Sequence, residues 1–294
     1  MTVQEHDVAL PGGHLRVLEV GRPGALPAAD SEVVVLVHGL AGGAATWAPL
    51  LAELDRRDVA FPVIAPDLIG HPNADYSLGG YANEIRDLLT ARGHRRATIV
   101  GHSLGGGIAL QFCYQYPQIC GRLVLVDAGG LGPELHPVLR AATLPGAEWA
   151  LPLLAHTRVI STVGWLVDSG RAILGRGTTG HHTLSAFGSL ADGARRRAFV
   201  ITARNIINIA GQRVSGVDKL HLTAEVPTMI VWGGRDPIIP AAHARQATAA
   251  LPDARVEVFE NAGHFPHCDE PVRFADLLLD FLAGTTPAPY STQR

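Results

Sequence analysis

Short apolar runs rich in Val and Ile recur along this 294-residue chain, and helix-like segments separate most of them. Such runs are typical of strands that are buried on both faces of a parallel sheet. The predicted strands are residues 33–37, 63–64, 97–100, 123–126, 228–232 and 255–259, and the predicted helices are residues 47–57, 81–92, 104–116, 241–251 and 271–282. With antiparallel strands before Gly21, this alternation predicts an α/β fold whose mostly parallel, eight-stranded sheet carries helices on both faces.

The alternation of strands and helices stops between Leu131 and Leu222. This stretch holds apolar helical patterns broken by prolines and glycines, and no segment in it has a convincing strand pattern. Its apolar residues are spaced for packing rather than for a lone solvated helix. We therefore predict a helical insertion at residues 131–222 between two parts of an α/β core, residues 1–130 and 223–294.

The composition is that of a globular domain with a sizeable core. Hydrophobic residues make up 47% of the chain and charged residues 17%, which argues against intrinsic disorder. The net charge of -3 and the isolated Arg triplet at 195–197 give no basic groove for nucleic acid. The chain has no apolar stretch of the roughly 20 residues that span a bilayer, no visible signal peptide and no CxxC pair among its three cysteines. We therefore expect reduced thiols, a cytoplasmic location and no membrane span.

The predicted strand at residues 97–100 runs into the sequence GHSLG at residues 101–105 and then into a helix. This GxSxG pattern is typical of a nucleophile elbow, a tight turn that lifts a serine hydroxyl above the sheet. The glycines two residues before and after the serine allow the flanking backbone to approach closely. The following helix points its positive N-terminal end at the site, which favours an oxyanion. The segment predicts Ser103 as a nucleophile.

A serine nucleophile needs a base, and the base needs an acid that orients it. In elbow enzymes the chain order is serine, then Asp or Glu, then His. Asp236 follows the predicted strand 228–232, and His264 follows the predicted strand 255–259. All three residues fall at carboxyl ends of strands, where open α/β sheets build their sites. The order predicts catalysis by Ser103, His264 and Asp236.

Other residues compete for these roles. His267 is an alternative base, although its place before the last helix also suits packing or capping. Asp127 follows a neighbouring strand and is an alternative orienting acid. His102 flanks the nucleophile but is expected to point elsewhere. The pair at residues 181–182 consists of histidines without a suitably spaced third ligand, so no metal site is predicted.

Acyl transfer also needs N–H donors for the oxyanion. The residue after the nucleophile, Leu104, is expected to give one. The Gly-rich loop after the first parallel strand is expected to give the second, from Leu40 or alternatively from Ala41. His38 is expected to brace this loop rather than to take part in catalysis.

With these residues in place, the chain resembles the α/β-hydrolase superfamily. The similarity covers residues 33–130 and 226–282 and rests on VLVHGLAGGAATW, VIAPDLIGH, IVGHSLGGG, IVWGGRDPIIP and NAGHFPH. It implies that residues 131–222 form a cap that closes over Ser103 and defines the shape of the substrate. One departure concerns the loop after Asp67, where the family often has a Gly-x-Gly-x-Ser turn. Residues 70–75 read GHPNAD instead, so the contacts of this loop with the pocket are altered.

Within this superfamily, the haloalkane dehalogenases and epoxide hydrolases use an aspartate nucleophile, so a serine at position 103 disfavours those reactions. The sequence GGLGP at residues 129–133 is similar to a segment of the carbon–carbon bond hydrolases that cleave meta-cleavage products. Those enzymes commonly carry Asn just before the serine and Trp just after the histidine, where this chain has His102 and Phe265. Cofactor-free haloperoxidase-like esterases share the general pattern equally well.

We therefore expect a serine hydrolase for a small, fairly apolar ester or related acyl compound, acting through an acyl-enzyme without a metal or organic cofactor. Candidate pocket walls are Trp149, Trp165, Phe187 and Phe265, with core packing as the open alternative for the first three. Carbon–carbon cleavage of a vinylogous diketone is the alternative reaction. Acyl transfer and a ligand-binding protein with slow turnover are further alternatives. The expected partner is a small-molecule substrate, and no oligomeric state is predicted.

Overall fold

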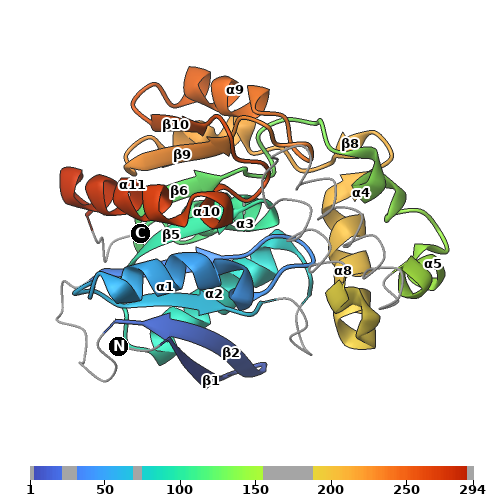
Figure 1. The fold of residues 1–294 in the computed structure, drawn as a ribbon, viewed down its shortest axis with the longest axis horizontal. Helices are drawn as coiled ribbons and strands as arrows, with labels where there is room; N and C mark the ends of the chain where they lie inside the picture. Colours follow the sequence, from blue (N-terminus) through green and yellow to red (C-terminus); the bar gives the residue numbers. More distant parts are fainter. Residues whose placement is uncertain (1–2, 22–31, 69–74, 155–187, 290–294) are drawn as a thin grey trace.

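A computed structural model describes residues 3–21, 32–68, 75–154 and 188–289 and places one sheet between two layers of helices (Figure 1). The eight strands follow the order β1-β2-β4-β3-β5-β6-β9-β10. Their bounds are Gln4–Leu10 (β1), Gly13–Val20 (β2), Glu32–Val37 (β3), Val63–Pro66 (β4), Arg96–His102 (β5), Cys120–Val126 (β6), Thr228–Gly233 (β9) and Arg255–Phe259 (β10). Strands β1 and β2 are antiparallel, β2 is antiparallel to β4, and all other pairs are parallel. The predicted α/β fold is confirmed.

Helices cover both faces of this sheet because successive side chains of each strand point to opposite faces. The covering helices are α1 (Ala48–Arg56), α2 (Leu78–Ala91), α3 (Leu104–Gln115), α9 (Ala242–Ala250) and α11 (Pro271–Gly284). On strand β5, Ile99 packs into the apolar cluster under α2, α3 and α9, whereas its neighbour Val100 packs into the cluster under α1 and α11. The core therefore consists of two apolar layers, one on each face of the sheet.

The described parts of residues 131–222 lie beyond the end of the sheet where the parallel strands finish (Figure 1). Their elements are α4 (Pro137–Ala141), α5 (Ala147–Leu154), η2 (Ser189–Ala191), α8 (Gly193–Ile206), β7 (Ile207–Asn208), β8 (Gly211–Gln212) and η3 (Val217–Thr223). Strands β7 and β8 form an antiparallel pair, so the expectation of a stretch without strands is wrong at this point. Two-residue strands are too short to leave an alternating pattern in a sequence. The domain boundaries at residues 131 and 222 stay a prediction.

A third apolar cluster joins this region to the loop that follows β3. Ala41 of that loop shares the cluster with Leu151 of α5 and with Phe199 of α8. The helices beyond the sheet therefore rest on the same loop that was expected to give an oxyanion donor. Within the described ranges, no helix is long and apolar enough to cross a bilayer.

Candidate active site

Ser103 lies on the turn between β5 and α3 with an unusual backbone conformation, φ +54° and ψ -118°. A positive φ in a residue with a Cβ atom costs of order 1–3 kcal/mol, so surrounding bonds have to hold it. The N–H of Ser103 donates to the carbonyl of Val126 at 2.9 Å, and its own carbonyl accepts from Gly106 at 2.9 Å and Gly129 at 2.8 Å. The strained turn is thereby tied to β6 and to the loop that follows it.

The glycines of the elbow are there because other backbone atoms occupy the space of a side chain. A Cβ atom on Gly101 would lie 2.1 Å from the carbonyl oxygen of Gly105, and one on Gly105 would lie 2.2 Å from that of Val37. Real Cβ atoms do not approach backbone oxygens so closely. These two short distances explain why the elbow predicted at residues 101–105 has glycine at both positions.

His264 and Asp236 meet in the loops after β10 and β9. Nδ1 of His264 lies 2.7 Å from Oδ2 of Asp236, whose other oxygen, Oδ1, accepts from the N–H groups of Ile238 at 2.7 Å and Ile239 at 3.1 Å. Burial by itself would raise the pKa of Asp236, but the adjacent imidazole and these hydrogen bonds outweigh burial and lower the pKa. The carboxylate of Asp236 is therefore ionised and fixed against His264.

The two competing residues take other positions. His267 is fully buried and packs on the indole of Trp47, with ring centroids 4.1 Å apart. Asp127 is also fully buried and accepts from the N–H of Gly233 at 2.9 Å. The carboxylate that is hydrogen-bonded to His264 belongs to Asp236. This bond favours the predicted pair over the two alternatives.

His102 points away from the turn that carries Ser103 and toward the backbone of His264. Its Nε2 lies 2.7 Å from the carbonyl oxygen of His264, and the two rings have centroids 4.8 Å apart. Burial, then the neighbouring His264, lower the pKa of His102 well below its ordinary value, so the ring is neutral and Nε2–H donates. His102 thus supports the loop of His264, a contact that sequence reasoning missed because the two residues are far apart in the chain.

His38 braces the loop after β3, as expected. Its Nε2 accepts from the N–H of Leu68 at 3.1 Å, so Nδ1 carries the hydrogen and donates to the carbonyl of Gly39 at 2.9 Å. This loop carries Leu40, and it turns at Ala41, which has φ +60°. Leu104 is the first residue of α3, and the N–H groups of a first helical turn have no partner within the helix.

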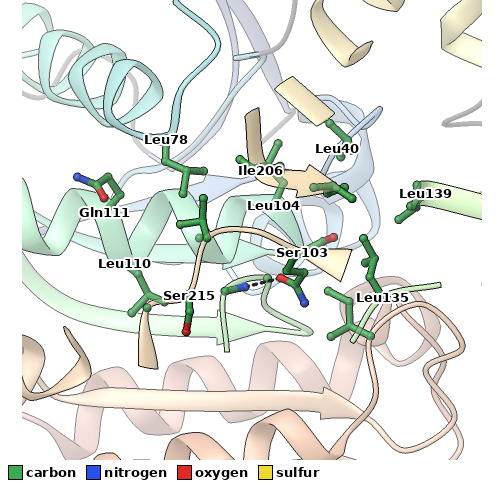
Figure 2. Close-up of a pocket in the computed structure, with 18 of the residues that line it drawn as sticks. Leu40, Leu78, Ser103, Leu104, Leu110, Gln111, Leu135, Leu139, Ile206 and Ser215 are labelled. Atoms are coloured by element: carbon green, nitrogen blue, oxygen red, sulfur yellow. Dashed lines mark hydrogen bonds between the residues drawn. The ribbon is translucent and has the colours of Figure 1, made fainter. Parts of the chain in front are cut away.

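Two cavities meet at Ser103, and both are also lined by Leu40 and Leu139. The smaller, of about 80 Å³, is walled mainly by leucine and isoleucine side chains (Figure 2). The larger, of about 450 Å³, is lined by residues of the loop after β3, by His264 and Phe265, and by residues of α4 and α8. Ser103 and His264 therefore face one shared space.

The structure describes two of the four aromatic residues that were expected to line the pocket. Phe265 lines the larger cavity beside His264. Trp149 is 79% exposed and lines neither cavity, because α5 turns this side chain outward. The structure therefore corrects the expectation of Trp149 as a wall. Trp165 and Phe187, like the histidines at residues 181–182, lie outside the described residues.

An ion pair that the sequence did not predict lies on the wall of the larger cavity. The guanidinium of Arg195 on α8 donates to Oδ2 of Asp67 at 3.1 Å, and Oδ1 of Asp67 lies 3.8 Å from Nε2 of His38. In the sequence, Arg195 was considered only as part of a basic triplet. The sequence signal for this ion pair was a cation in the first turn of a helix that has a buried apolar face.

Among the described residues, the acidic, cysteine and histidine side chains close enough to share a metal ion are Asp127, Asp236 and His264, with ligand atoms within 4.8 Å of one another. Asp236 and His264 are bonded to each other at 2.7 Å. Their atoms are thus engaged with each other, and the group is suited to moving and holding a proton.

Comparison with known proteins supplies further findings. A sequence model of the alpha/beta hydrolase family matches residues 34–277. An uncharacterized protein of Mycobacterium tuberculosis (strain ATCC 25618 / H37Rv) is 41% identical over 97% of this chain and 85% of its own length. A 2-hydroxy-6-oxononadienedioate/2-hydroxy-6-oxononatrienedioate hydrolase of Pseudomonas sp is 27% identical over 86% of this chain and 88% of its own length. The crystal structure of a carboxylesterase of Bacillus subtilis has the same fold, with a TM-score of 0.71 and 20% identity over 97% of this chain and 93% of that one.

Proposed function

The chain belongs to the alpha/beta hydrolase family, and we propose that it is a serine hydrolase with Ser103 as nucleophile, His264 as general base and Asp236 as the acid that orients the base. The observation that carries this proposal is the 2.7 Å bond between His264 and Asp236 beside a cavity that Ser103 also lines. A strained serine, a buried imidazole and an ionised carboxylate in this arrangement suit nucleophilic catalysis.

The bond to Asp236 determines how His264 acts. The carboxylate accepts the hydrogen on Nδ1, so Nε2 keeps its lone pair for the hydroxyl proton of Ser103. As Nε2 takes this proton, Oγ of Ser103 forms a bond to the acyl carbon, and the carbonyl electron pair moves onto its oxygen. His264 then returns the proton to the leaving group as the bond to that group breaks, which leaves an acyl-enzyme and an alcohol.

The oxyanion of this step is held by backbone N–H groups. Leu104 supplies one donor from the first turn of α3, a helix whose N-terminal end carries partial positive charge. Leu40 supplies the second from the loop that His38 braces, with Ala41 as the alternative. In the second half of the reaction His264 removes a proton from water, and the hydroxide releases the acid from Ser103.

The two cavities indicate the shape of the substrate. The smaller cavity at Ser103 is walled by leucine and isoleucine and accepts a short apolar group (Figure 2). The larger cavity accommodates the rest of the molecule and adds Phe199 and Phe265 to its walls. A small, fairly apolar ester fits this pair of spaces. The helices at residues 131–222 that contribute to these walls are proposed to act as the cap.

Carbon–carbon cleavage of a vinylogous diketone is the second candidate. Arg16 and Arg195 both line the larger cavity, where Arg195 is paired with Asp67, and Arg16 is paired with Glu5 outside the lining. Two guanidinium groups at the wall favour a substrate whose carboxylate takes the place of one of these acidic partners. The Pseudomonas relative described above is named as a hydrolase of such dicarboxylates.

The test uses Ser103→Ala, with Thr90→Ala as the control because Thr90 is an exposed hydroxyl residue on α2. We expect Ser103→Ala to abolish hydrolysis of p-nitrophenyl butyrate while circular dichroism and the melting temperature stay close to those of the wild type. A fluorophosphonate probe should label the wild type and Thr90→Ala but not Ser103→Ala. Activity retained by Ser103→Ala would overturn the proposal.

A panel of substrates distinguishes ester hydrolysis from carbon–carbon cleavage and from ligand binding without turnover. Faster turnover of 2-hydroxy-6-oxo-6-phenylhexa-2,4-dienoate than of esters would favour carbon–carbon cleavage. Labelling of Ser103 without turnover of any ester, lactone or diketone would favour a ligand-binding protein.

A further inference from the structure

Asp127 is a second buried carboxyl group next to Asp236, and the proposed reaction gives it no role. It follows β6 directly, its side chain is fully buried, and its backbone has φ +43°. Its N–H donates to the carbonyl of Val231 at 3.0 Å, and its Oδ1 accepts from the N–H of Gly233 at 2.9 Å. A strained, buried aspartate persists only where its surroundings hold it in place.

The carboxyl groups of Asp127 and Asp236 lie next to each other. One oxygen of each lies within 4.8 Å of the other and of a ring nitrogen of His264, and Oδ2 of Asp127 is buried without a hydrogen-bond partner among the described residues. Two buried carboxylates this close repel each other, so one of them is held neutral. A proton on one acid removes this repulsion, and it gives the protonated oxygen a hydrogen to donate to the other acid.

The surroundings decide which acid carries this proton. Asp236 is bonded to the imidazole of His264 and to two backbone N–H groups, all of which stabilise a negative charge. Asp127 has the single N–H of Gly233. Burial, followed by the negative charge of Asp236, raises the pKa of Asp127 well above its ordinary range, and Asp269 adds to the effect.

We propose that Asp127 is a neutral carboxylic acid that donates its proton to Asp236 in a hydrogen bond and so positions Asp236 for its bond to His264. The inference rests on the proposed function. It makes Asp127 a positioning residue, since it reaches the reacting atoms only through Asp236. The pair of acids carries one negative charge, which is the charge needed opposite the imidazolium that forms when His264 takes the proton of Ser103.

Infrared spectroscopy tests the proton without any substrate. The difference spectrum between the wild type and Asp127→Asn at pH 8 should show the carbonyl stretch of a protonated carboxylic acid. Only carboxylate bands in that spectrum would overturn the proposal, whether or not the protein is a hydrolase. Addition of EDTA or Ca²⁺ should leave the spectrum unchanged, because a change would indicate a cation site at Asp127, Asp236 and His264 instead.

Kinetics test the positioning role. Asp127→Asn keeps an acceptor for Gly233 and an N–H donor for Asp236. We therefore expect its kcat to stay within about threefold of the wild-type value and the midpoint of its pH profile to stay unchanged. Asp127→Leu removes the donor, and loss of a hydrogen bond to a charged group predicts a fall in kcat of roughly 10- to 100-fold with little change in KM. In an Asp236→Asn background the same Leu substitution should have no further effect on kcat.

Two kinetic results would contradict the positioning role of Asp127. An acid-ward shift of the pH profile in Asp127→Asn would mean that Asp127 is ionised in the wild type. Equal losses of kcat from Asp127→Leu in both backgrounds would mean a structural role that is independent of Asp236. If Asp127→Leu does not fold, Asp127→Asn and its infrared spectrum still decide the matter.

Discussion

Nδ1 of His264 lies 2.7 Å from Oδ2 of Asp236, while backbone N–H groups bond the other carboxylate oxygen. This arrangement keeps the lone pair of the imidazole on Nε2. Asp236→Asn would present an amide group to His264 and favour the wrong tautomer. We expect kcat for p-nitrophenyl butyrate to fall by about four orders of magnitude, by analogy with the aspartate of serine protease triads, with KM little changed.

The control for this prediction is Asp218→Asn, which removes an exposed carboxylate from η3. It should leave kcat unchanged. An Asp236→Asn variant that keeps more than about a tenth of the wild-type kcat would mean that another acid orients His264.

The sequence predicted the sheet and the elbow because both depend on neighbours in the chain. Alternating strand and helix patterns reveal a parallel sheet, and the glycines at residues 101 and 105 reveal the tight turn. The contacts that complete the candidate site join residues that are far apart in the chain, such as His102 with the carbonyl of His264 and Arg195 with Asp67. Local patterns carry no information on such pairs, so the second carboxyl at Asp127 could be considered only as a rival of Asp236.

Two of the three glycines of α3, at positions 105 and 107, should respond differently to the same substitution. A Cβ atom on Gly105 would lie 2.2 Å from a backbone oxygen, whereas one on Gly107 has its nearest neighbour at 3.6 Å. We expect Gly105→Ala to cost about 3 kcal/mol or more because backbone has to move. Gly107→Ala should stabilise the helix by about 0.5–1 kcal/mol. Thermal melts measure both, and equal melting temperatures would contradict the close approach in the elbow.

Glu84 on α2 should make stability fall as the pH rises. Burial, and then the negative charges of Asp75 and Asp87, raise its pKa from 4.5 to about 8. The folded protein therefore holds a proton on Glu84 that the unfolded chain releases above pH 4.5. Stability is lost between about pH 4.5 and pH 8, at a rate of up to about 1.4 kcal/mol per pH unit.

Glu84→Gln tests this effect because glutamine is neutral at every pH. Urea denaturation should show the variant more stable than the wild type at pH 8 and no more stable near pH 4.5. Glu225→Gln, at an exposed position, should show no such gain at pH 8. A gain for Glu84→Gln that is equal at both pH values would assign the effect to packing instead of charge.

The ion pair of Arg195 and Asp67 should link α8 to the loop after β4. The side chain of Asp67 is 9% exposed and that of Arg195 is 35% exposed, so the carboxylate is the group that loses most if the pair is broken. Arg195→Met leaves this carboxylate nearly buried without its cation, and we expect a loss of about 1–3 kcal/mol. Asp67→Asn removes the charge that needs the cation. In the Asp67→Asn background, Arg195→Met should therefore cost much less, with a coupling energy of about 1 kcal/mol in a double-mutant cycle measured by urea denaturation. Strictly additive losses would mean that the two groups are too well solvated to stabilise one another, and that Arg195 faces the larger cavity as an unpaired cation.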